Sequence, residues 1–126
     1  ISLGKYKNGY KHGEWKKFYS NGALKEKRFY KNGLKEGVYN GFYKDGSKNF
    51  VFIFENGEYN GTNRIWAYGG QIIEELNFKK GQQYGSQKVW YLDGKVKSNY
   101  IVKNKRRYGL LGTKNCTNVS EEVFNL

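Results

Sequence analysis

Few residues of this chain could perform nucleophilic or acid–base chemistry. His12 is the only histidine and Cys116 the only cysteine among 126 residues, and nucleophilic catalysis needs a nucleophile, a base and an orienting group held together. A pairing of Cys116 with His12 is conceivable, but nothing in the sequence supports it or indicates a third group. The sequence therefore favours a protein that is not an enzyme, and any catalytic role would have to depend on these two residues.

Other arrangements that support chemistry are missing as well. Glu74 and Glu75 are adjacent, so on a strand they would lie on opposite faces and could not act together on one substrate atom. A single cysteine excludes an internal disulfide and a multi-cysteine metal site. The glycines recur at turn positions, which explains them without a phosphate-binding loop. We expect no cofactor and no metal.

Charge indicates binding instead. A net charge of +12 attracts acidic proteins, anionic lipid head groups or nucleic acid. Residues 1–36 and 85–108 carry nearly all of the excess, whereas residues 37–84 are close to neutral. A nucleic-acid site would need a continuous basic stripe to follow the phosphate backbone, so the sequence argues against nucleic acid and leaves a protein or an anionic membrane as the partner.

The densest basic cluster is a candidate binding site near the end of the regular part of the chain. Two readings stay open: the cluster contacts an anionic partner, or it only keeps an exposed turn soluble and prevents pairing between sheet edges. Its members are Lys103, Lys105, Arg106 and Arg107.

Two aromatic columns are further candidates. The first could stack on a ligand, although packing between neighbouring hairpins is the simpler explanation; it contains Phe18, Phe42, Trp66 and Trp90. The second should face the other way and is the better candidate for a binding surface, because tyrosine offers contact area at little entropic cost. It contains Tyr19, Tyr43 and Tyr91, with Ala67 as the exception.

These positions recur because the sequence is periodic. Gly13, Gly37, Gly61, Gly85 and Gly109 follow one another at intervals of 24 residues, without insertion or deletion. The intervals define four complete units, and residues 1–12 form a partial one; the complete units are 13–36, 37–60, 61–84 and 85–108. Each unit contains two turn signals, mostly Asn-Gly or Asp-Gly, between runs rich in Tyr, Phe, Val and Ile.

Each unit therefore predicts two strands and two turns. Consecutive strands joined by tight turns pair antiparallel, so we expect an all-β fold: an elongated, single antiparallel meander of stacked β-hairpins built from 24-residue repeats, with roughly nine to ten strands. Alternation would place Leu24, Arg28 and Tyr30 on one face and Lys25 and Lys27 on the other.

The turn dipeptides favour two-residue type I′ turns, in which both central residues have positive φ. In the fourth unit Lys105 stands where the pattern has glycine, so we expect that turn to depart from the others. Residues 109–126 leave the pattern and form a C-terminal cap or tail, whose last seven residues, "SEEVFNL", could make a short helix. The cap would shield a strand edge, and the alternative is a tail that binds a partner.

The chain begins at Ile1 and contains no methionine. We therefore expect that an N-terminal segment was removed and that the protein is extracytoplasmic, either secreted or a lipoprotein.

The pattern G-x-W-x-x-[FY]-Y-x-N-G-x-L-K-x-x-x-x-Y-x-N-G, found in residues 13–33, resembles the MORN-type repeat, in particular a bacterial, antitoxin-like variant. The resemblance covers residues 4–108, although Asn63 and Gln87 replace the tryptophan of Trp15 in the third and fourth units. It implies an elongated sheet of stacked hairpins that serves in protein or membrane association. A weaker resemblance, in residues 89–96, is to bacterial choline-binding wall repeats.

Together these observations predict a non-enzymatic scaffold for protein–protein interaction. The alternatives are peripheral binding to an anionic membrane through the basic ends, and binding of a small ligand or cell-wall polymer by the aromatic rows.

Overall fold

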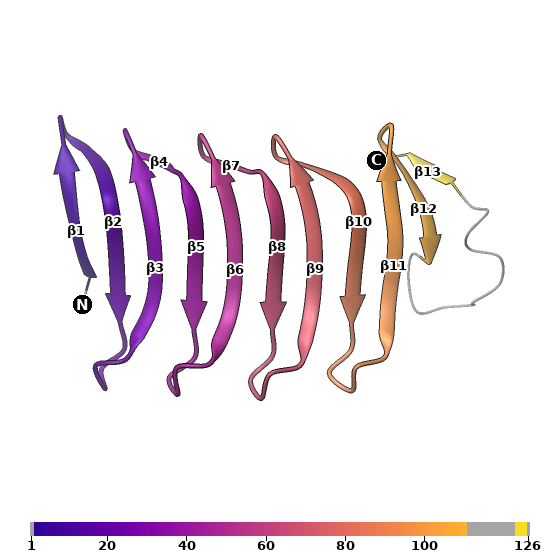
Figure 1. Cartoon of the computed structure of the whole chain (residues 1–126), viewed down its shortest axis with the longest axis horizontal. Coiled ribbons are helices and arrows are strands. Elements are labelled where there is room, and N and C mark those ends of the chain that lie inside the picture. Colours follow the sequence, from indigo (N-terminus) through magenta and orange to yellow (C-terminus); the bar gives the residue numbers. More distant parts are fainter. Residues whose placement is uncertain (1, 111–122, 126) are drawn as a thin grey trace.

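The computed structural model describes the backbone of residues 2–110 and 123–125 and shows one open antiparallel sheet. Figure 1 shows the strands side by side in chain order, with the N-terminus beside β1 and the turns along two opposite edges. All regular structure in these residues is β-strand, as the sequence predicts. The described residues therefore include no helix that could span a membrane.

Thirteen strands make up the described sheet, more than the nine to ten predicted. Two of them, β4 and β7, have only two residues each and pair with the strand before them, so the prediction missed short segments rather than hairpins. The strands are β1 (Ser2–Lys7), β2 (Tyr10–Phe18), β3 (Leu24–Lys31), β4 (Leu34–Lys35), β5 (Gly37–Phe42), β6 (Lys48–Glu55), β7 (Glu58–Tyr59), β8 (Gly61–Trp66), β9 (Ile72–Lys79), β10 (Gln82–Trp90), β11 (Val96–Lys103), β12 (Arg106–Leu110) and β13 (Val123–Asn125).

The turns along one edge of the sheet are the predicted two-residue type. Asn32 and Gly33 both have positive φ, at 52° and 82°, which matches the right-handed twist of the strands they join. The prediction that the turn at Lys105 departs in conformation is wrong, because Asn104 and Lys105 have φ of 53° and 61°. The hairpin geometry holds lysine in a region that glycine occupies more easily.

The turns along the opposite edge are longer, so the prediction of type I′ geometry is wrong there. In the first of them Gly22 N donates to Tyr19 O at 3.0 Å, and Tyr19 N donates to Ala23 O at 2.8 Å. This is a three-residue loop in which a glycine with positive φ follows an ordinary turn. Asn21 favours it, because its side-chain oxygen accepts a hydrogen bond from Ala23 N at 2.9 Å.

Most neighbouring strand pairs lose register after the two-residue turns. From the pair Gln83↔Phe78 to the pair Gln87↔Leu76, β10 advances by four residues while β9 advances by two. The same kind of shift occurs between β1 and β2, and it bends the strand away from its partner. The last hairpin differs, because β11 and β12 stay in one continuous register from Lys103↔Arg106 onwards.

The buried core is thin. Trp15, Tyr100 and Val102 are the only buried hydrophobic residues in the described chain, and most other side chains are half-buried or exposed. In β11 the alternation is regular, with Ser98, Tyr100 and Val102 buried and the residues between them exposed. The described residues form a single layer, so cross-strand packing within the sheet is what stabilises them.

The C-terminal segment contains a strand where we predicted a helix. Val123–Asn125 forms β13 and pairs with β12 through Arg107↔Phe124, so the helix prediction is wrong for these three residues. Pairing with a free strand edge satisfies more backbone groups than one isolated helical turn. The rest of the predicted cap, residues 111–122 and 126, lies outside the described residues.

Candidate functional site: an aromatic sheet face and a basic cleft

The most prominent surface feature is a ladder of half-buried rings across the middle of one sheet face. Phe50 and Phe52 stack with centroids 4.5 Å apart, and Tyr39 meets Phe50 at 5.1 Å. The ladder continues from Phe54 through Tyr59 to Phe78, each step 4.9 Å between centroids. We call these six residues the aromatic face: Tyr39, Phe50, Phe52, Phe54, Tyr59 and Phe78.

A shallow hollow of about 210 Å³ lies on the aromatic face. Phe52, Tyr59 and Phe78 line it together with Leu76 and the carboxylate of Glu74. The neighbouring Glu75 instead pairs with Arg64 at 3.1 Å. The hollow therefore contains one acid and no pair of carboxylates that could divide an acid and a base role.

A polar network borders the aromatic face on its N-terminal side. Tyr39 donates a hydrogen bond from its hydroxyl to Glu26 Oε1 at 2.7 Å, and Arg28 donates to the same oxygen at 2.8 Å. Burial, followed by this hydrogen bond to the carboxylate, raises the pKa of Tyr39 to about 12. The phenol therefore stays protonated and acts here as a hydrogen-bond donor that fixes the edge of the face.

A column of inward side chains fills the gaps where strands lose register. Trp15 Nε1 donates to Lys5 O at 3.1 Å, and Asn63 Oδ1 accepts from Ile53 N at 2.9 Å. Gln87, which is fully buried, accepts from Asn77 N at 3.0 Å and donates to Asn77 O at 2.7 Å. Each side chain bonds the backbone ten residues before it, so the amides that replace tryptophan in the MORN-like pattern are structural.

The tyrosine column predicted as a binding surface is largely engaged within the protein. The hydroxyl of Tyr19 donates to Phe42 O at 2.7 Å, and that of Tyr43 donates to Trp66 O at 2.8 Å. Both side chains are half-buried. Tyr91 is 39% exposed and makes no corresponding bond among the described residues. Tyr19 and Tyr43 therefore connect one hairpin to the next, and the described structure does not gather the three tyrosines into one site.

The two candidate tryptophans are also half-buried and lie at strand ends. Trp66 ends β8 and Trp90 ends β10, so both are next to the three-residue turns rather than on the aromatic face. Lys48 Nζ lies 5.4 Å from the centroid of Trp66, a distance at which a cation contacts the face of a ring.

The basic cluster divides between the two faces of the sheet. Lys103 and Arg106 are directly opposite each other, and Arg107 is opposite the buried Val102, so Arg106 and Arg107 point to different faces. Lys105 and Arg107 line a cleft of about 420 Å³ with Gln82 and Gln83. We call this the basic cleft. Sequence analysis missed the two glutamines, since nothing in the pattern distinguishes them from surface polar residues.

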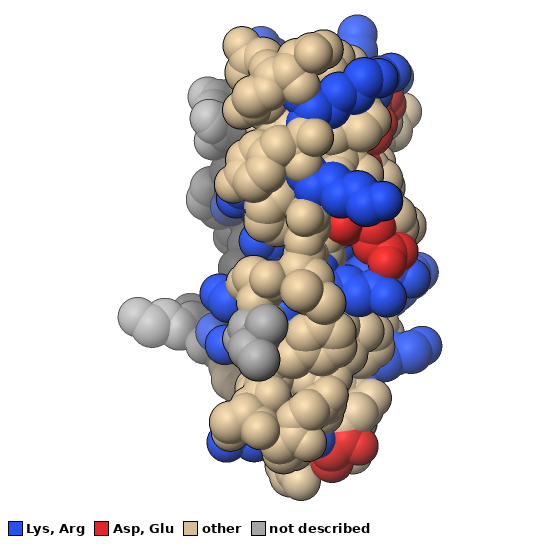
Figure 2. Space-filling model, turned by 90° about the vertical axis from the view of Figure 1, so that its left-hand side faces the viewer, with Lys and Arg blue, Asp and Glu red and all other residues tan. Residues whose placement is uncertain are grey.

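Positive charge is spread over the molecule beyond this cleft. Seen from the β1 edge, lysine and arginine side chains project along the height of the sheet with acidic side chains among them (Figure 2). One such group joins Glu14 to Lys16 at 3.1 Å and to Lys27 at 3.6 Å. The hydrogen bond from Lys16 lowers the pKa of Glu14. Because both pairs are exposed, they contribute little stability.

The described residues do not test the conceivable pairing of His12 with Cys116. His12 is half-buried and its Nδ1 has no hydrogen-bond partner among them, and Cys116 lies outside the described residues. Within those residues no group of three His, Cys, Asp or Glu side chains could hold a metal ion.

In comparisons with known proteins, no family model matches this chain and no curated protein matches it.

Proposed function

We propose that this chain is a non-enzymatic scaffold whose aromatic face binds a protein partner. The observation that carries the proposal is the ladder of six half-exposed rings on a sheet over which the described residues form no second layer. Aromatic residues are enriched at the centres of protein interfaces, where they supply large contact areas with few rotatable bonds. A contiguous apolar surface of this kind marks an interaction site.

The shape of the face favours a protein over a small ligand. Its hollow, about 210 Å³, is smaller than the roughly 300–1,000 Å³ typical of small-molecule pockets. The rings extend from β5 to β9, so they match a broad partner better than a single buried ligand. This extent supports protein–protein contact over the alternatives of a small ligand or a cell-wall polymer.

Backbone bonds between turns hold the face in one shape. Gly33 N donates to Lys11 O at 3.0 Å, and Gly57 N donates to Lys35 O at 2.9 Å, in each case connecting a two-residue turn to the hairpin before it. We call these the turn bridges. A surface ordered before binding loses little conformational entropy on association, which suits a scaffold.

We further propose that the sheet is an array of 24-residue hairpin units of the MORN type. The bonds of Tyr19 and Tyr43 support the proposal, because these residues are 24 apart and bond equivalent carbonyls. The resemblance to MORN-type repeats implies association with proteins or membranes. It agrees with a binding role for the aromatic face.

Site-specific photo-crosslinking tests the function. A photoreactive phenylalanine at Phe52 should crosslink a discrete partner in cells that produce the protein, and the same group at Val51, on the opposite face of β6, should not. A second matched pair is Phe78 and Asn77 on β9. Equal crosslinking from both faces, or none from Phe52 and Phe78, would contradict the proposal.

A further inference from the structure

The turn at Asn104 and Lys105 keeps the conformation of the other two-residue turns but lacks their bridge. Gly81 N donates to Tyr59 O at 2.8 Å, as the turn bridges at Gly33 and Gly57 do. In the part of the chain that the structure describes, Lys105 N makes no corresponding bond to Gln83 O. A space remains between this turn and the start of β10, and it is the basic cleft.

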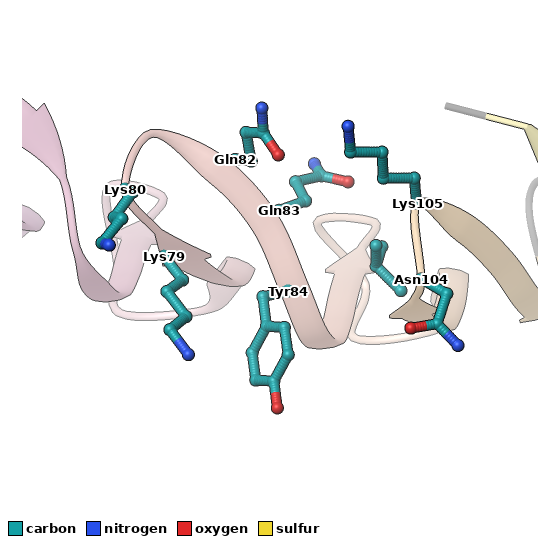
Figure 3. A pocket seen from close by; sticks show the side chains of 8 residues that line it. Lys79, Lys80, Gln82, Gln83, Tyr84, Asn104 and Lys105 are labelled. Atoms are coloured by element: carbon teal, nitrogen blue, oxygen red, sulfur yellow. The ribbon is translucent and has the colours of Figure 1, made fainter.

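The side chains around the cleft present hydrogen-bond donors. Figure 3 shows a hollow next to the cleft that shares Gln82, Gln83 and Lys105 with it; in this view Gln83 and Lys105 point to one side and Tyr84 to the other. Gln83 Oε1 already accepts a hydrogen bond from the hydroxyl of Tyr100 at 2.9 Å. This bond turns the oxygen of Gln83 toward Tyr100 and leaves its NH₂, which can only donate, as the group without a partner among the described residues.

Arg107 supplies a second, fixed donor. Its guanidinium lies 5.2 Å from the centroid of the Tyr100 ring, and its Nε is buried without a hydrogen-bond partner among the described residues. Stacking on a ring restricts the planar guanidinium, which is suited to bidentate contact with a carboxylate. Lys105 adds a mobile ammonium group from the turn.

The lining of the cleft contains two cations and two amides but no acid. Within residues 2–110 and 123–125, the guanidinium of Arg107, the ammonium and backbone N–H of Lys105 and the NH₂ of Gln83 have no acceptor, so a ligand suited to them accepts hydrogen bonds and carries negative charge. The cleft also adjoins the aromatic face, because Gln83 is directly opposite Phe78 in the sheet. Directly opposite residues share a face, so a partner that covers Phe78 also reaches Gln83.

We propose that the basic cleft receives a carboxylate side chain of the protein partner, next to apolar residues that cover the aromatic face. This inference rests on the proposed function and adds the chemistry of the partner: an acidic residue beside an aromatic or aliphatic one. The cleft then fixes the position of the partner along the sheet, since the rings by themselves allow it to slide.

Titration of the ¹⁵N-labelled chain by nuclear magnetic resonance tests the proposal. The probe is the blocked peptide acetyl-Glu-Phe-Glu-amide, and its matched control is acetyl-Gln-Phe-Gln-amide. We expect saturable shifts of the Gln83 side-chain amide and the Lys105 backbone amide with the acidic peptide only, at a dissociation constant of about 1 mM for so small a ligand. Added salt should weaken the binding.

Two charge variants separate the cleft from general attraction. Lys105→Gln should weaken peptide binding about fivefold or more, whereas Lys103→Gln, which removes the same charge from the opposite face, should change it less than about twofold. Both residues are exposed, and circular dichroism checks that the variants fold. An equal loss in the two variants, or no saturable shift, would overturn the proposal.

Two further arms distinguish other anions. Inorganic phosphate, and vesicles of phosphatidylcholine with phosphatidylserine, should shift the same resonances only weakly. Tighter binding than the peptide shows would assign the cleft to phosphate or to a membrane and would also overturn the proposal. The crosslinking from Phe52 does not involve the cleft. If crosslinking from Phe52 succeeds but the titration fails, the proposed contact with an acidic residue is wrong and the proposed scaffold function is unaffected.

Discussion

The two halves of the sheet use different kinds of side chain to fill the gaps where neighbouring strands lose register. In the N-terminal half Trp15 fills the gap where β2 loses register, and it meets Tyr6 and Tyr30 edge-on with ring centroids 5.3 Å and 5.9 Å away. In the C-terminal half Asn63 and Gln87 fill the corresponding gaps with amides. The first half is therefore held by ring packing and the second by buried hydrogen bonds to the backbone.

The difference shows which property a side chain needs in order to fill such a gap. The gap exposes backbone groups of the preceding strand, and a buried backbone group without a partner is destabilising. An indole N–H can satisfy one carbonyl, whereas a glutamine can satisfy both the N–H and the carbonyl of Asn77. At this position the length of the side chain and its capacity for hydrogen bonds matter more than its hydrophobicity. A change from tryptophan to asparagine or glutamine is therefore accommodated.

The largest effect should come from Trp15→Ala. The change removes a side chain that is 8% exposed, its ring contacts and its bond to Lys5, and we expect it to lower the free energy of unfolding by about 3 kcal/mol. Urea denaturation measures the loss. A decrease below about 1 kcal/mol would show that ring packing does not hold the N-terminal half.

Gln87→Ala should have the next largest effect. It leaves the N–H and carbonyl of Asn77 buried without their partner, so we expect a loss of about 2 kcal/mol. Gln82→Ala, at an exposed position of the same strand, is the matched control and should change stability by less than about 0.5 kcal/mol. Similar results for the two variants would contradict the role given to buried amides.

Tyr43→Phe should have a smaller effect. It removes one hydroxyl bond to Trp66 O, and we expect a loss of about 1 kcal/mol. Tyr84→Phe is the control in the C-terminal half, because Tyr84 is 59% exposed. The thermal unfolding midpoints should fall only for Tyr43→Phe, and an equal fall for both would show that the fastening bond contributes nothing.

Lys105→Gly should stabilise the protein. Lys105 has φ of 61°, a conformation that glycine adopts without the strain of a side chain, and we expect a gain of about 0.5 kcal/mol after the greater flexibility of unfolded glycine is subtracted. Lys79→Gly, at an exposed strand position without positive φ, should destabilise instead. Denaturant midpoints of the two variants should therefore move in opposite directions.

Alkaline pH should affect the N-terminal half through Tyr39. The pKa of Tyr39 is raised to about 12 in the folded protein, above the value of about 10 in an unfolded chain. Its contribution to stability is complete below pH 10 and is lost as the pH rises to about 12. Between these values Tyr39→Phe should lose less stability than the unchanged protein in urea denaturation, and parallel losses would contradict the assignment.

The sequence predicted the class and the strand order of the fold because periodic glycines and Asn-Gly pairs are local signals. It missed the three-residue turns, since Asn-Gly also suits a loop in which only Gly22 needs positive φ. It missed the roles of Gln83 and Gln87, because a buried amide and an exposed one look the same in a sequence. The division of the basic cluster depends on the register between β11 and β12, which no short pattern encodes.

The contacts between neighbouring strands also determine where unfolding of this molecule starts. Each strand of the open sheet pairs only with the strands beside it, so the stability of the array is close to a sum of nearest-neighbour terms. Unfolding in such a chain resembles the opening of a zipper that starts at its weakest link. The hairpin of β11 and β12 lacks a turn bridge to the hairpin before it, so we expect fraying to begin there. Hydrogen exchange should then be faster in that hairpin than at Phe52 in the centre of the sheet.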